Sequence, residues 1–409
     1  MNSSSPKTQK PLTFKFFFPT SKGLEETALK EITELGISVD KKKAIQNGGI
    51  ALKVTFEDAF RISIWSRCIS RAWLRIDYFE FDHESEIPEK ISKARVRDYL
   101  DKRDTFLIKN KIDHRVMKEF KNSYFINQVV KDGVVGCFHR GEAPKVEKEN
   151  PTTQFYFHIS PANSRNKKFQ GELFVDFVGF SLFMRGYREK GFEAPMRENL
   201  AAGIVLASLN ETQKDFTTFY DPMCGSGTLI IECFLLKNKI SPQVLNLKKS
   251  HSWSCFKFPV TKDNHDLLDN FRNQIAEALE FEISDDFNWF ASDLQGKSGS
   301  ALRRFLSKLS LDYERITFEK LDFLEATPLA ESCFLLMNPP YAIRMGEEEE
   351  VEKLYYEIGE TIKNKFKESR AMIFTSNPDL RKQIQLKTTK RIPVRNGKIE
   401  SRIFLYDLY

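Results

Sequence analysis

The chain has 409 residues, of which 41% are hydrophobic and 29% charged, a composition that excludes a disordered or fibrous protein and predicts two or three domains. No run of eighteen apolar residues occurs, which argues against a transmembrane helix. The net charge of +6 is uneven: residues 1–184 hold 31 Lys or Arg against 24 Asp or Glu, and residues 185–409 hold 32 against 33. This favours a polyanion-binding module ahead of a nearly neutral one, although solvated surface explains it equally well.

The N-terminal end and the cysteines indicate where the protein works. Residues 1–12 are rich in Ser, Lys and Pro and contain no apolar segment, so we expect a disordered tail and no signal peptide. The six cysteines include no CxxC pair and the histidines no HExxH pattern, so the sequence predicts no metal site. Reduced thiols in a cytoplasmic enzyme fit this pattern.

Residues 13–70 predict a small α+β unit. The apolar run 14–18 and the alternating run 50–54 are expected as strands. One helix is expected to begin at Gly23 and to end before Gly36, because glycine is typical just beyond a helix end. A second helix is expected over 59–69, where apolar residues recur at helical spacing.

Residues 71–180 predict a second α+β unit with a basic surface. Its expected elements are strands at 73–81, 105–108, 154–159 and 173–178, and helices at 88–100 and 122–130. Basic residues recur through it, and on a helical period Arg115, Lys118 and Lys121 would share a face that follows phosphates. A solvated helix face explains the same spacing equally well.

Residues 181–409 alternate between strands and helices, which predicts a Rossmann-like, doubly wound α/β domain. The expected strands are 219–220, 289–291, 316–318, 333–337 and 371–375, and the expected helices are 229–236, 298–310 and 351–366. The Asn396-Gly397 pair predicts a closing hairpin with a type I′ turn.

A glycine-rich turn follows the first of these strands and is the first motif that carries chemistry. It consists of Asp221, Pro222, Met223, Cys224, Gly225, Ser226, Gly227 and Thr228. The two glycines let the backbone turn tightly and approach a ligand, and the absence of a following Lys-Ser or Lys-Thr excludes a Walker A loop. A Gly-x-Gly turn alone can be merely structural. The complete string, however, resembles motif I of class I S-adenosylmethionine methyltransferases, in which it supports the methionine moiety of the cofactor.

Carboxylates at the ends of the next two strands are candidate cofactor ligands. Asp293 is placed to accept the ribose hydroxyls of a nucleoside cofactor, with a strand-end cap as the alternative. Asp322 could accept the adenine amino group. The separation of Asp221 and Asp293 indicates an insertion over 238–286, whose segment 253–259 we expect to cover part of the sheet edge.

The string Asn338-Pro339-Pro340-Tyr341 follows the apolar strand at 333–337 and resembles motif IV of amino-methyltransferases. The amino group of a base is a poor nucleophile because its lone pair is delocalised into the ring. The Asn338 amide oxygen and the Pro339 carbonyl are suited to accept its N–H bonds, and Tyr341 can stack on an extruded base. A chance turn with the same letters is the alternative.

These motifs together make the chain similar to the THUMP-domain RNA guanine-N2 methyltransferases, including the N-terminal half of the bacterial large-subunit rRNA enzyme and the archaeal tRNA enzymes. The matching stretches are 19–26, 185–188, 194–202, 221–232, 338–341 with Gly346, and the hairpin at Asn396-Gly397. The resemblance implies a ferredoxin-like segment at 13–70, a THUMP RNA-binding domain at 71–180, and a methyltransferase domain at 181–409.

The resemblance also implies S-adenosyl-L-methionine as cofactor, guanine N2 as acceptor, and Glu198 and Asn199 as further residues beside the cofactor. Ala342 departs from the glycine usual at its position in the family. The favoured substrate is large-subunit rRNA, with tRNA as the alternative. A DNA adenine or cytosine amino-methyltransferase, a protein-glutamine methyltransferase, and an RNA-binding protein with a vestigial catalytic fold are the competing hypotheses.

Overall fold

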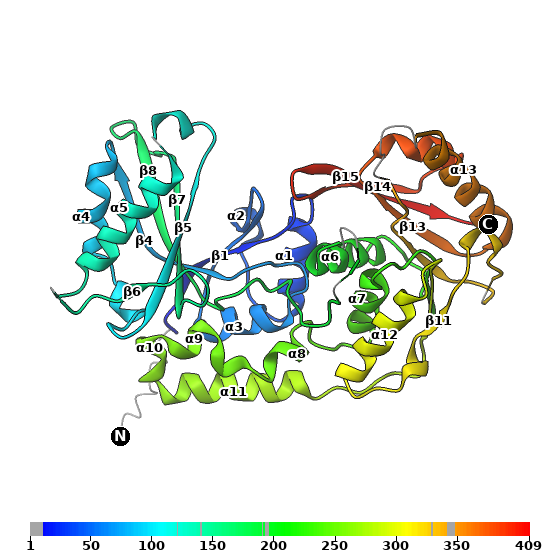
Figure 1. Cartoon of the computed structure of the whole chain (residues 1–409), viewed down its shortest axis with the longest axis horizontal. Helices are drawn as coiled ribbons and strands as arrows, with labels where there is room; N and C mark the ends of the chain where they lie inside the picture. Colours follow the sequence, from blue (N-terminus) through cyan, green and yellow to red (C-terminus); the bar gives the residue numbers. More distant parts are fainter. Residues whose placement is uncertain are drawn as a thin grey trace, which may run out of the picture.

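The computed structural model describes residues 11–120, 122–139, 141–189, 191–192, 196–328, 330–341 and 348–409. Most of the expected tail, Lys121 of the expected basic helix, and Ala342 lie outside these residues. Figure 1 shows two units side by side, an N-terminal unit in blue and cyan and a C-terminal unit that ends in orange and red.

An eight-stranded sheet forms the N-terminal unit, in the order β2-β3-β1-β4-β8-β7-β5-β6. Its strands are β1 (Phe14–Pro19), β2 (Ile45–Gln46), β3 (Gly49–Val54), β4 (Trp73–Phe81), β5 (Thr105–Ile112), β6 (Lys145–Val146), β7 (Thr153–Pro161) and β8 (Phe169–Asp176). Its helices are α1 (Glu25–Glu34), α2 (Lys41–Ala44), α3 (Phe56–Trp65), α4 (Ile87–Ser92) and α5 (Ser123–Gly136). Because β4 pairs with both β1 and β8, this sheet runs across the domain boundary expected at residue 70.

Local sequence signals explain most of these elements. Helix α3 begins at a capping box, in which the Thr55 hydroxyl accepts the Asp58 backbone N–H at 3.1 Å and Asp58 accepts that of Thr55 at 3.5 Å. In β7 the alternate residues Phe155, Phe157 and Ile159 are fully buried, which is the period of a half-buried strand. The six strands predicted for residues 13–180 correspond to β1, β3, β4, β5, β7 and β8 and are confirmed.

The helix predicted over 88–100 is too long. Helix α4 ends at Ser92, and a short 3₁₀ turn at Val96–Asp98 follows it. Ile91 and Val96 are both fully buried, and their separation of five residues does not keep them on one helix face. The chain leaves the helix between these two residues, and both side chains reach the core.

The predicted helix face of Arg115, Lys118 and Lys121 is also wrong. A 3₁₀ turn spans Met117–Glu119, and the Asp113 carboxylate accepts the Arg115 backbone N–H at 2.9 Å and two guanidinium N–H groups. This aspartate starts a turn at the end of β5 and so competes with the helix. Arg115 is held by Asp113, so Arg115 and Lys118 do not share a helix face.

A seven-stranded sheet forms the C-terminal unit, in the order β11-β10-β9-β12-β13-β15-β14. Its strands are β9 (Thr218–Asp221), β10 (Asn288–Ser292), β11 (Thr317–Glu319), β12 (Phe334–Met337), β13 (Arg370–Thr375), β14 (Lys390–Asn396) and β15 (Ile399–Asp407). Helices α6 (Glu198–Leu209), α7 (Thr228–Lys237) and α12 (Lys297–Lys308) pack on one face, and α13 (Glu348–Lys365) packs on the other. The first five strands are parallel and β15 is antiparallel, as expected for a Rossmann-like fold with a closing hairpin.

The closing hairpin is present, but its turn differs from the predicted type I′. Asn396 pairs with Ile399, so the two turn residues are Gly397 and Lys398. Gly397 has φ +63°, whereas Lys398 is not among the described residues with positive φ. One positive φ at the first turn position is the pattern of a type II′ turn, because type I′ requires positive φ at both positions.

The insertion predicted between α7 and β10 forms four short to medium helices, α8 (Val244–Leu247), α9 (Ser254–Lys257), α10 (Pro259–Lys262) and α11 (His265–Leu279). The expectation that 253–259 covers the edge of the catalytic sheet is wrong. Backbone N–H groups of Ser254 and Cys255 bond the carbonyls of Val178 and Phe177 at 3.0 and 2.8 Å. Figure 1 shows α11 below α3 and α8, with the chain continuing from it to the C-terminal unit, so the insertion connects the catalytic sheet with the N-terminal unit.

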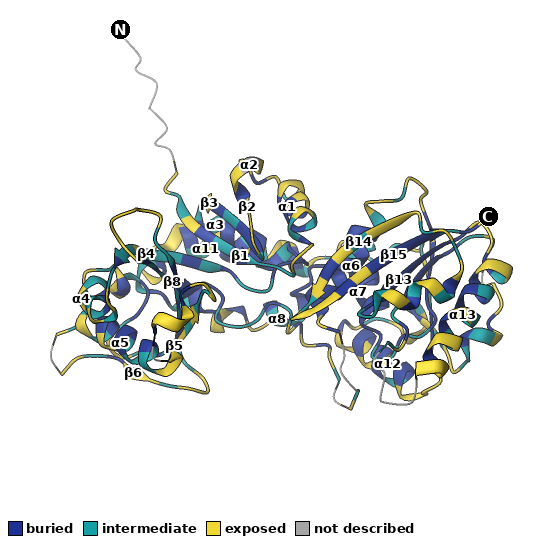
Figure 2. Ribbon diagram, turned by 90° about the horizontal axis from the view of Figure 1, so that it is seen from above, coloured by how far each residue is buried: buried dark blue, intermediate teal, exposed yellow. Residues whose placement is uncertain are grey.

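Burial follows the layered construction of each unit. Figure 2 shows buried strands and inner helix faces in dark blue, with exposed outer faces in yellow. No helix within the described residues is long and apolar enough to cross a membrane. All six cysteines belong to the described residues and are free thiols.

Candidate active site

The two predicted motifs lie at neighbouring strand ends of one sheet. Strand β9 lies between β10 and β12, and all three strands run parallel. Asp221 ends β9 opposite Ala291 of β10, and Asn338 directly follows Met337, the last residue of β12. The carboxyl ends of parallel strands meet at one sheet edge, which is where ligands bind in such folds.

The glycine turn connects β9 to α7 and is held against β10. Its Cys224 N–H donates to the Ser292 carbonyl at 3.0 Å, and the Ser292 hydroxyl donates to the Pro222 carbonyl at 3.1 Å. Gly227 has φ +76°, and a Cβ there would lie 2.5 Å from Leu302 Cδ2, so this turn requires glycine.

Gly225 leaves open space on the ligand side of the same turn. Its φ is +53°, and a Cβ at this position would meet no described atom within 4 Å. Beyond the turn, the Ser226 and Thr228 hydroxyls lie 2.9 Å apart at the N-terminus of α7. The turn therefore provides a backbone cradle with hydroxyl groups at its rim.

Asp293 lies at the end of β10, as predicted, and its carboxylate is tied to the glycine turn. One oxygen accepts the Gly225 N–H at 2.8 Å, and the other accepts the Gln295 N–H at 2.8 Å. The side chain is half-buried. The two bonds fix the carboxylate beside the cradle, and each oxygen retains a further lone pair for hydroxyl donors.

Asp221 is the most unusual carboxylate of the site. It is 1% exposed, and neither carboxylate oxygen accepts a hydrogen bond of ordinary length and angle from a described residue, although the backbone N–H groups of Met223 and Ile230 oppose part of its pKa rise. Burial, together with the nearby Asp293 carboxylate, raises the pKa of Asp221 well above its ordinary value. Unpartnered buried acceptors are costly, so their presence at the glycine turn points to a donor group of a ligand.

The Asn338–Tyr341 string presents a second unpartnered acceptor. The Asn338 Oδ1 atom is buried and has no hydrogen-bond partner among the described residues. Pro339 is buried and Pro340 is exposed. The half-buried Tyr341 ring packs edge-on against Phe374 of β13, with ring centroids 6.3 Å apart and an interplanar angle of 83°.

The three remaining predicted residues have structural partners. Asp322 accepts the Leu324 N–H at 3.0 Å and caps a 3₁₀ turn beyond β11. Glu198, at the start of α6, forms an ion pair with Arg188 at 2.7 Å, and burial raises its pKa. The Asn199 amide donates to the Cys68 carbonyl at 3.1 Å, while its buried oxygen has no described partner.

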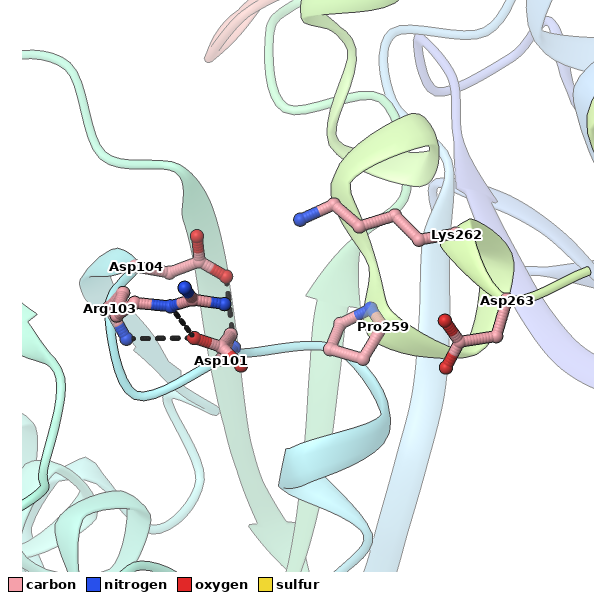
Figure 3. Close-up of a pocket in the computed structure, with 6 residues that line it drawn as sticks. All are labelled: Asp101, Arg103, Asp104, Pro259, Lys262 and Asp263. Carbon is pink, nitrogen blue, oxygen red and sulfur yellow. Dashed lines mark hydrogen bonds and ion pairs between the residues drawn. The ribbon is translucent and has the colours of Figure 1, made fainter.

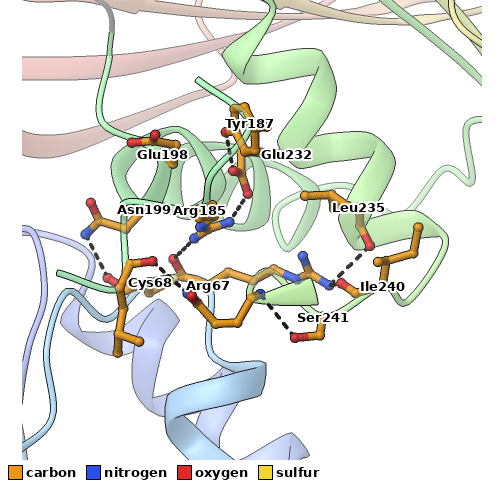
Figure 4. A network of polar contacts seen from close by, with 12 residues as sticks. Arg67, Cys68, Arg185, Tyr187, Glu198, Asn199, Glu232, Leu235, Ile240 and Ser241 are labelled. Carbon is orange, nitrogen blue, oxygen red and sulfur yellow. Dashed lines mark hydrogen bonds and ion pairs between the residues drawn. The ribbon is translucent and has the colours of Figure 1, made fainter. Parts of the chain in front are cut away.

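A buried polar network behind α7 was not predicted from the sequence (Figure 4). Arg185 forms an ion pair with Glu232 of α7, which also accepts the Tyr187 hydroxyl at 2.5 Å. Arg185 donates to the Arg67 carbonyl at 2.6 Å, and Arg67 donates to the Ile240 carbonyl at 2.7 Å. The network ties the N-terminal unit to the helix that follows the glycine turn. Arg67, Arg185 and Glu232 lie so far apart in the sequence that no motif or regular spacing could have predicted their contact.

A separate hollow of about 350 Å³ lies between the N-terminal unit and α10 (Figure 3). Its lining residues are Asp101, Arg103, Asp104, Pro259, Lys262 and Asp263. Asp101 accepts the backbone N–H and Nε–H of Arg103 at 3.0 and 3.1 Å, and Asp104 accepts the Asp101 N–H at 2.9 Å. The Asp101 and Asp104 carboxylates therefore form hydrogen bonds within their own loop. This hollow lies away from the catalytic sheet.

Comparison with known families shows which protein family the chain belongs to. Residues 185–403, more than half of the chain, match the family described as RMKL-like, methyltransferase domain. The chain belongs to this methyltransferase family. Residues 15–72 match the RlmL ferredoxin-like domain, which agrees with the ferredoxin-like segment predicted at the N-terminus.

Curated relatives and a solved structure extend over nearly the whole chain. The chain is 29% identical over 409 residues to the ribosomal RNA large subunit methyltransferase K/L of Hahella chejuensis, and 30% identical over 407 residues to that of Syntrophotalea carbinolica. The matches cover 97% and 96% of the chain but 53% of each relative, so the chain spans about half the length of these relatives. The fold matches that of SMU.472, a putative methyltransferase complexed with SAH, with a TM-score of 0.79, 24% identity, and 98% and 99% coverage of the two chains.

Proposed function

We propose that this protein uses S-adenosyl-L-methionine to methylate the N2 amino group of a guanosine in large-subunit rRNA. The observation that carries the proposal is the placement of the glycine turn and the Asn338–Tyr341 string at adjacent parallel strand ends, each with a buried unpartnered acceptor. The family match and the names of the curated relatives support the reaction and the RNA class.

The residues of the site fit the proposed cofactor. Asp221 offers buried acceptors for the amino group of a methionine moiety, and the open face at Gly225 lets the ligand approach the backbone. Asp293 is fixed by two N–H groups where it would accept the ribose hydroxyls. Pro222, Cys224, Ser226, Gly227 and Thr228 would shape the same cradle. Asp322 would reach the adenine, and Glu198 and Asn199 stay weaker candidates.

The proposed chemistry depends on the acceptors beside β12. When bound, S-adenosyl-L-methionine supplies a methyl group activated by its sulfonium. Asn338 Oδ1 and the Pro339 carbonyl would accept the two N–H bonds of guanine N2, which holds the nitrogen lone pair out of the ring system. Tyr341 would stack on the extruded base. Catalysis is then mainly the alignment of donor and acceptor.

The remaining parts of the chain would serve the same reaction in the cytoplasm. Residues 13–70 and 71–180 would form the ferredoxin-like and THUMP domains that bind the RNA, and residues 181–409 would form the methyltransferase domain. The net charge of +7 over residues 1–184, from 31 Lys or Arg and 24 Asp or Glu, suits RNA as the partner.

The proposal is tested by incubating the purified protein with in vitro-transcribed 23S rRNA and S-adenosylmethionine that carries a deuterated methyl group. Nucleoside mass spectrometry of the digested RNA then identifies the product. We expect deuterated N2-methylguanosine. A label that appears only in tRNA supplied in parallel would contradict the RNA class, and a label in N6-methyladenosine or N4-methylcytidine would contradict the acceptor.

A further inference from the structure

The C-terminal hairpin carries a concentration of positive charge that the proposed site does not use. Residues 381–402 contain eight Lys or Arg and a single Asp or Glu. The segment covers the end of a 3₁₀ helix at Pro378–Ile384, strand β14 and the first part of β15. Strand β14 is the outer edge of the seven-stranded sheet.

Strand register places three arginines on one face of this hairpin. Arg391 is paired with Phe404, and Arg402 is paired with Pro393 two residues further along. Directly paired antiparallel residues point to the same side of a sheet, so Arg391 and Arg402 share a face. Arg381 joins them, because its guanidinium lies 6.0 Å from the centroid of the Phe404 ring. The opposite face packs into one core cluster through Ile392, Val394 and Ile403, and on the arginine face Phe404 packs into another.

These three arginines have no acidic partner within the part of the chain that the structure describes. Arg391 donates to the Thr388 hydroxyl at 2.9 Å, which leaves its charge uncompensated. Three of the other five cations of the segment are paired: Lys382 with Asp379 at 3.0 Å, Lys390 with Glu211 at 3.1 Å, and Arg395 with Glu400 at 3.3 Å. Arg391 and Arg402 therefore place two uncompensated charges on one face of the hairpin.

This face lies level with the Asn338–Tyr341 string. Arg402 pairs with Thr375, the last residue of β13, and Ile373 of the same strand pairs with Met337 of β12. Arg402 therefore lies two strand spacings, or about 10 Å, to the side of β12, and about two residues beyond its last residue along the strand direction. Neighbouring nucleotides of one RNA strand can cover that distance.

The same hairpin touches the N-terminal unit. The Arg395 N–H donates to the Lys22 carbonyl at 2.9 Å, and a Cβ on Gly23 would lie 2.2 Å from the Pro393 oxygen. Figure 1 shows the red hairpin reaching across to the blue strands of that unit. The hairpin is therefore anchored on the N-terminal unit through backbone contacts at Lys22 and Gly23.

We propose that Arg381, Arg391 and Arg402 bind the phosphate backbone of the RNA next to the base that enters the site. Guanidinium groups suit this role because they bind phosphate oxygens in a bidentate manner. The inference rests on the proposed function and adds a second RNA contact, separate from the N-terminal domains. It would fix the position of the target nucleotide as well as add affinity.

The test compares three variants with the wild type: R391A/R402A, the charge-conserving R391K/R402K, and the control R272A/R303A. Arg272 and Arg303 are exposed arginines on α11 and α12, away from the hairpin. Binding to protein-free, in vitro-transcribed 23S rRNA is measured by filter binding between 50 and 300 mM salt. Binding of S-adenosylmethionine is measured by calorimetry.

R391A/R402A is expected to bind the rRNA roughly tenfold more weakly, with a salt slope lowered by about 1.5, because each lost phosphate contact lowers it by about 0.7 to 0.9. Its KM for RNA should rise in parallel, while its affinity for S-adenosylmethionine stays unchanged. R391K/R402K should keep the salt slope of the wild type, because lysine keeps the charge, while its affinity falls between those of the wild type and R391A/R402A, because lysine cannot bind phosphate in a bidentate manner.

The proposal is overturned if R391A/R402A keeps the RNA affinity and salt slope of the wild type. It is also overturned if the control loses as much affinity, since the effect would then reflect overall charge. A wild-type protein that methylates no RNA contradicts the proposed function itself. A wild-type protein that methylates rRNA beside an unaffected R391A/R402A variant contradicts the hairpin inference alone.

Discussion

Replacing Arg185 by methionine tests the buried network that joins the two units. The Arg185 and Glu232 side chains are 1% and 0% exposed, and Arg185 also donates to the Arg67 carbonyl. R185M leaves the Glu232 carboxylate buried with only the Tyr187 hydroxyl as donor. Removing one partner of such a pair costs about 3–5 kcal/mol of unfolding free energy. Methionine fills most of the volume of arginine, so the loss reports the charge and its hydrogen bonds.

The cost of R185M should depend on pH with a definite sign. Burial raises the pKa of Glu232, and Arg185 opposes that rise, so the variant should raise it further. A carboxyl group whose folded pKa exceeds its unfolded value takes up protons on folding. Stability then increases as the pH falls through the folded pKa. The deficit of R185M should therefore be largest near pH 8 and smaller near pH 5.5.

The assay is urea unfolding followed by the fluorescence of the buried Trp253 and Trp289, at both pH values. The double variant R185M/E232L removes both charges and should recover most of the loss, because an apolar pair of similar volume is often neutral. A single variant that loses less than about 1 kcal/mol, or an equal deficit at both pH values, would refute the reasoning.

Two further predictions concern the cofactor cradle. Asp293→Asn should weaken S-adenosylmethionine binding by about tenfold or more in calorimetry, because a hydrogen bond to a charged group contributes about 1.5–3 kcal/mol. The control Asp312→Asn, at an exposed position, should bind S-adenosylmethionine within twofold of the wild type. If Asp293→Asn bound the cofactor as tightly as the wild type, another acidic residue would have to hold the ribose. Gly227→Ala should lower the unfolding temperature more than Gly397→Ala. Both have positive φ, but only a Cβ at 227 meets Leu302, at 2.5 Å, so equal shifts would contradict the steric argument.

Local patterns predicted the catalytic sheet and the position of its motifs. The strand Phe334–Met337 is buried at every residue, because parallel strands are covered on both faces, and such strands show as continuous apolar runs. The glycine turn and the Asn338–Tyr341 string each follow such a run. Parallel topology then brings their ends to one edge, so the juxtaposition could be predicted from the sequence.

Long-range packing could not be predicted in the same way. In the insertion, the Cys255 backbone N–H donates to the Phe177 carbonyl. These two residues lie far apart in the chain and belong to no sequence motif. Arg67 and Glu232 belong to one buried network for reasons that are visible only once both units are folded. The helical spacing considered for Arg115 and Lys118 is not realised, because Asp113 starts a turn there. The roles assigned to the site residues stay predictions.

The Asn338→Ala variant tests the central claim most directly, because Asn338 is the residue that should act on the base without holding the cofactor. Methyl transfer to 23S rRNA and calorimetric binding of S-adenosylmethionine are measured on the same preparation. We expect transfer to fall by about a hundredfold or more, as for loss of a key transition-state hydrogen bond, while the affinity for the cofactor changes by less than threefold. Turnover equal to that of the wild type would contradict the assignment of the base pocket to the end of β12.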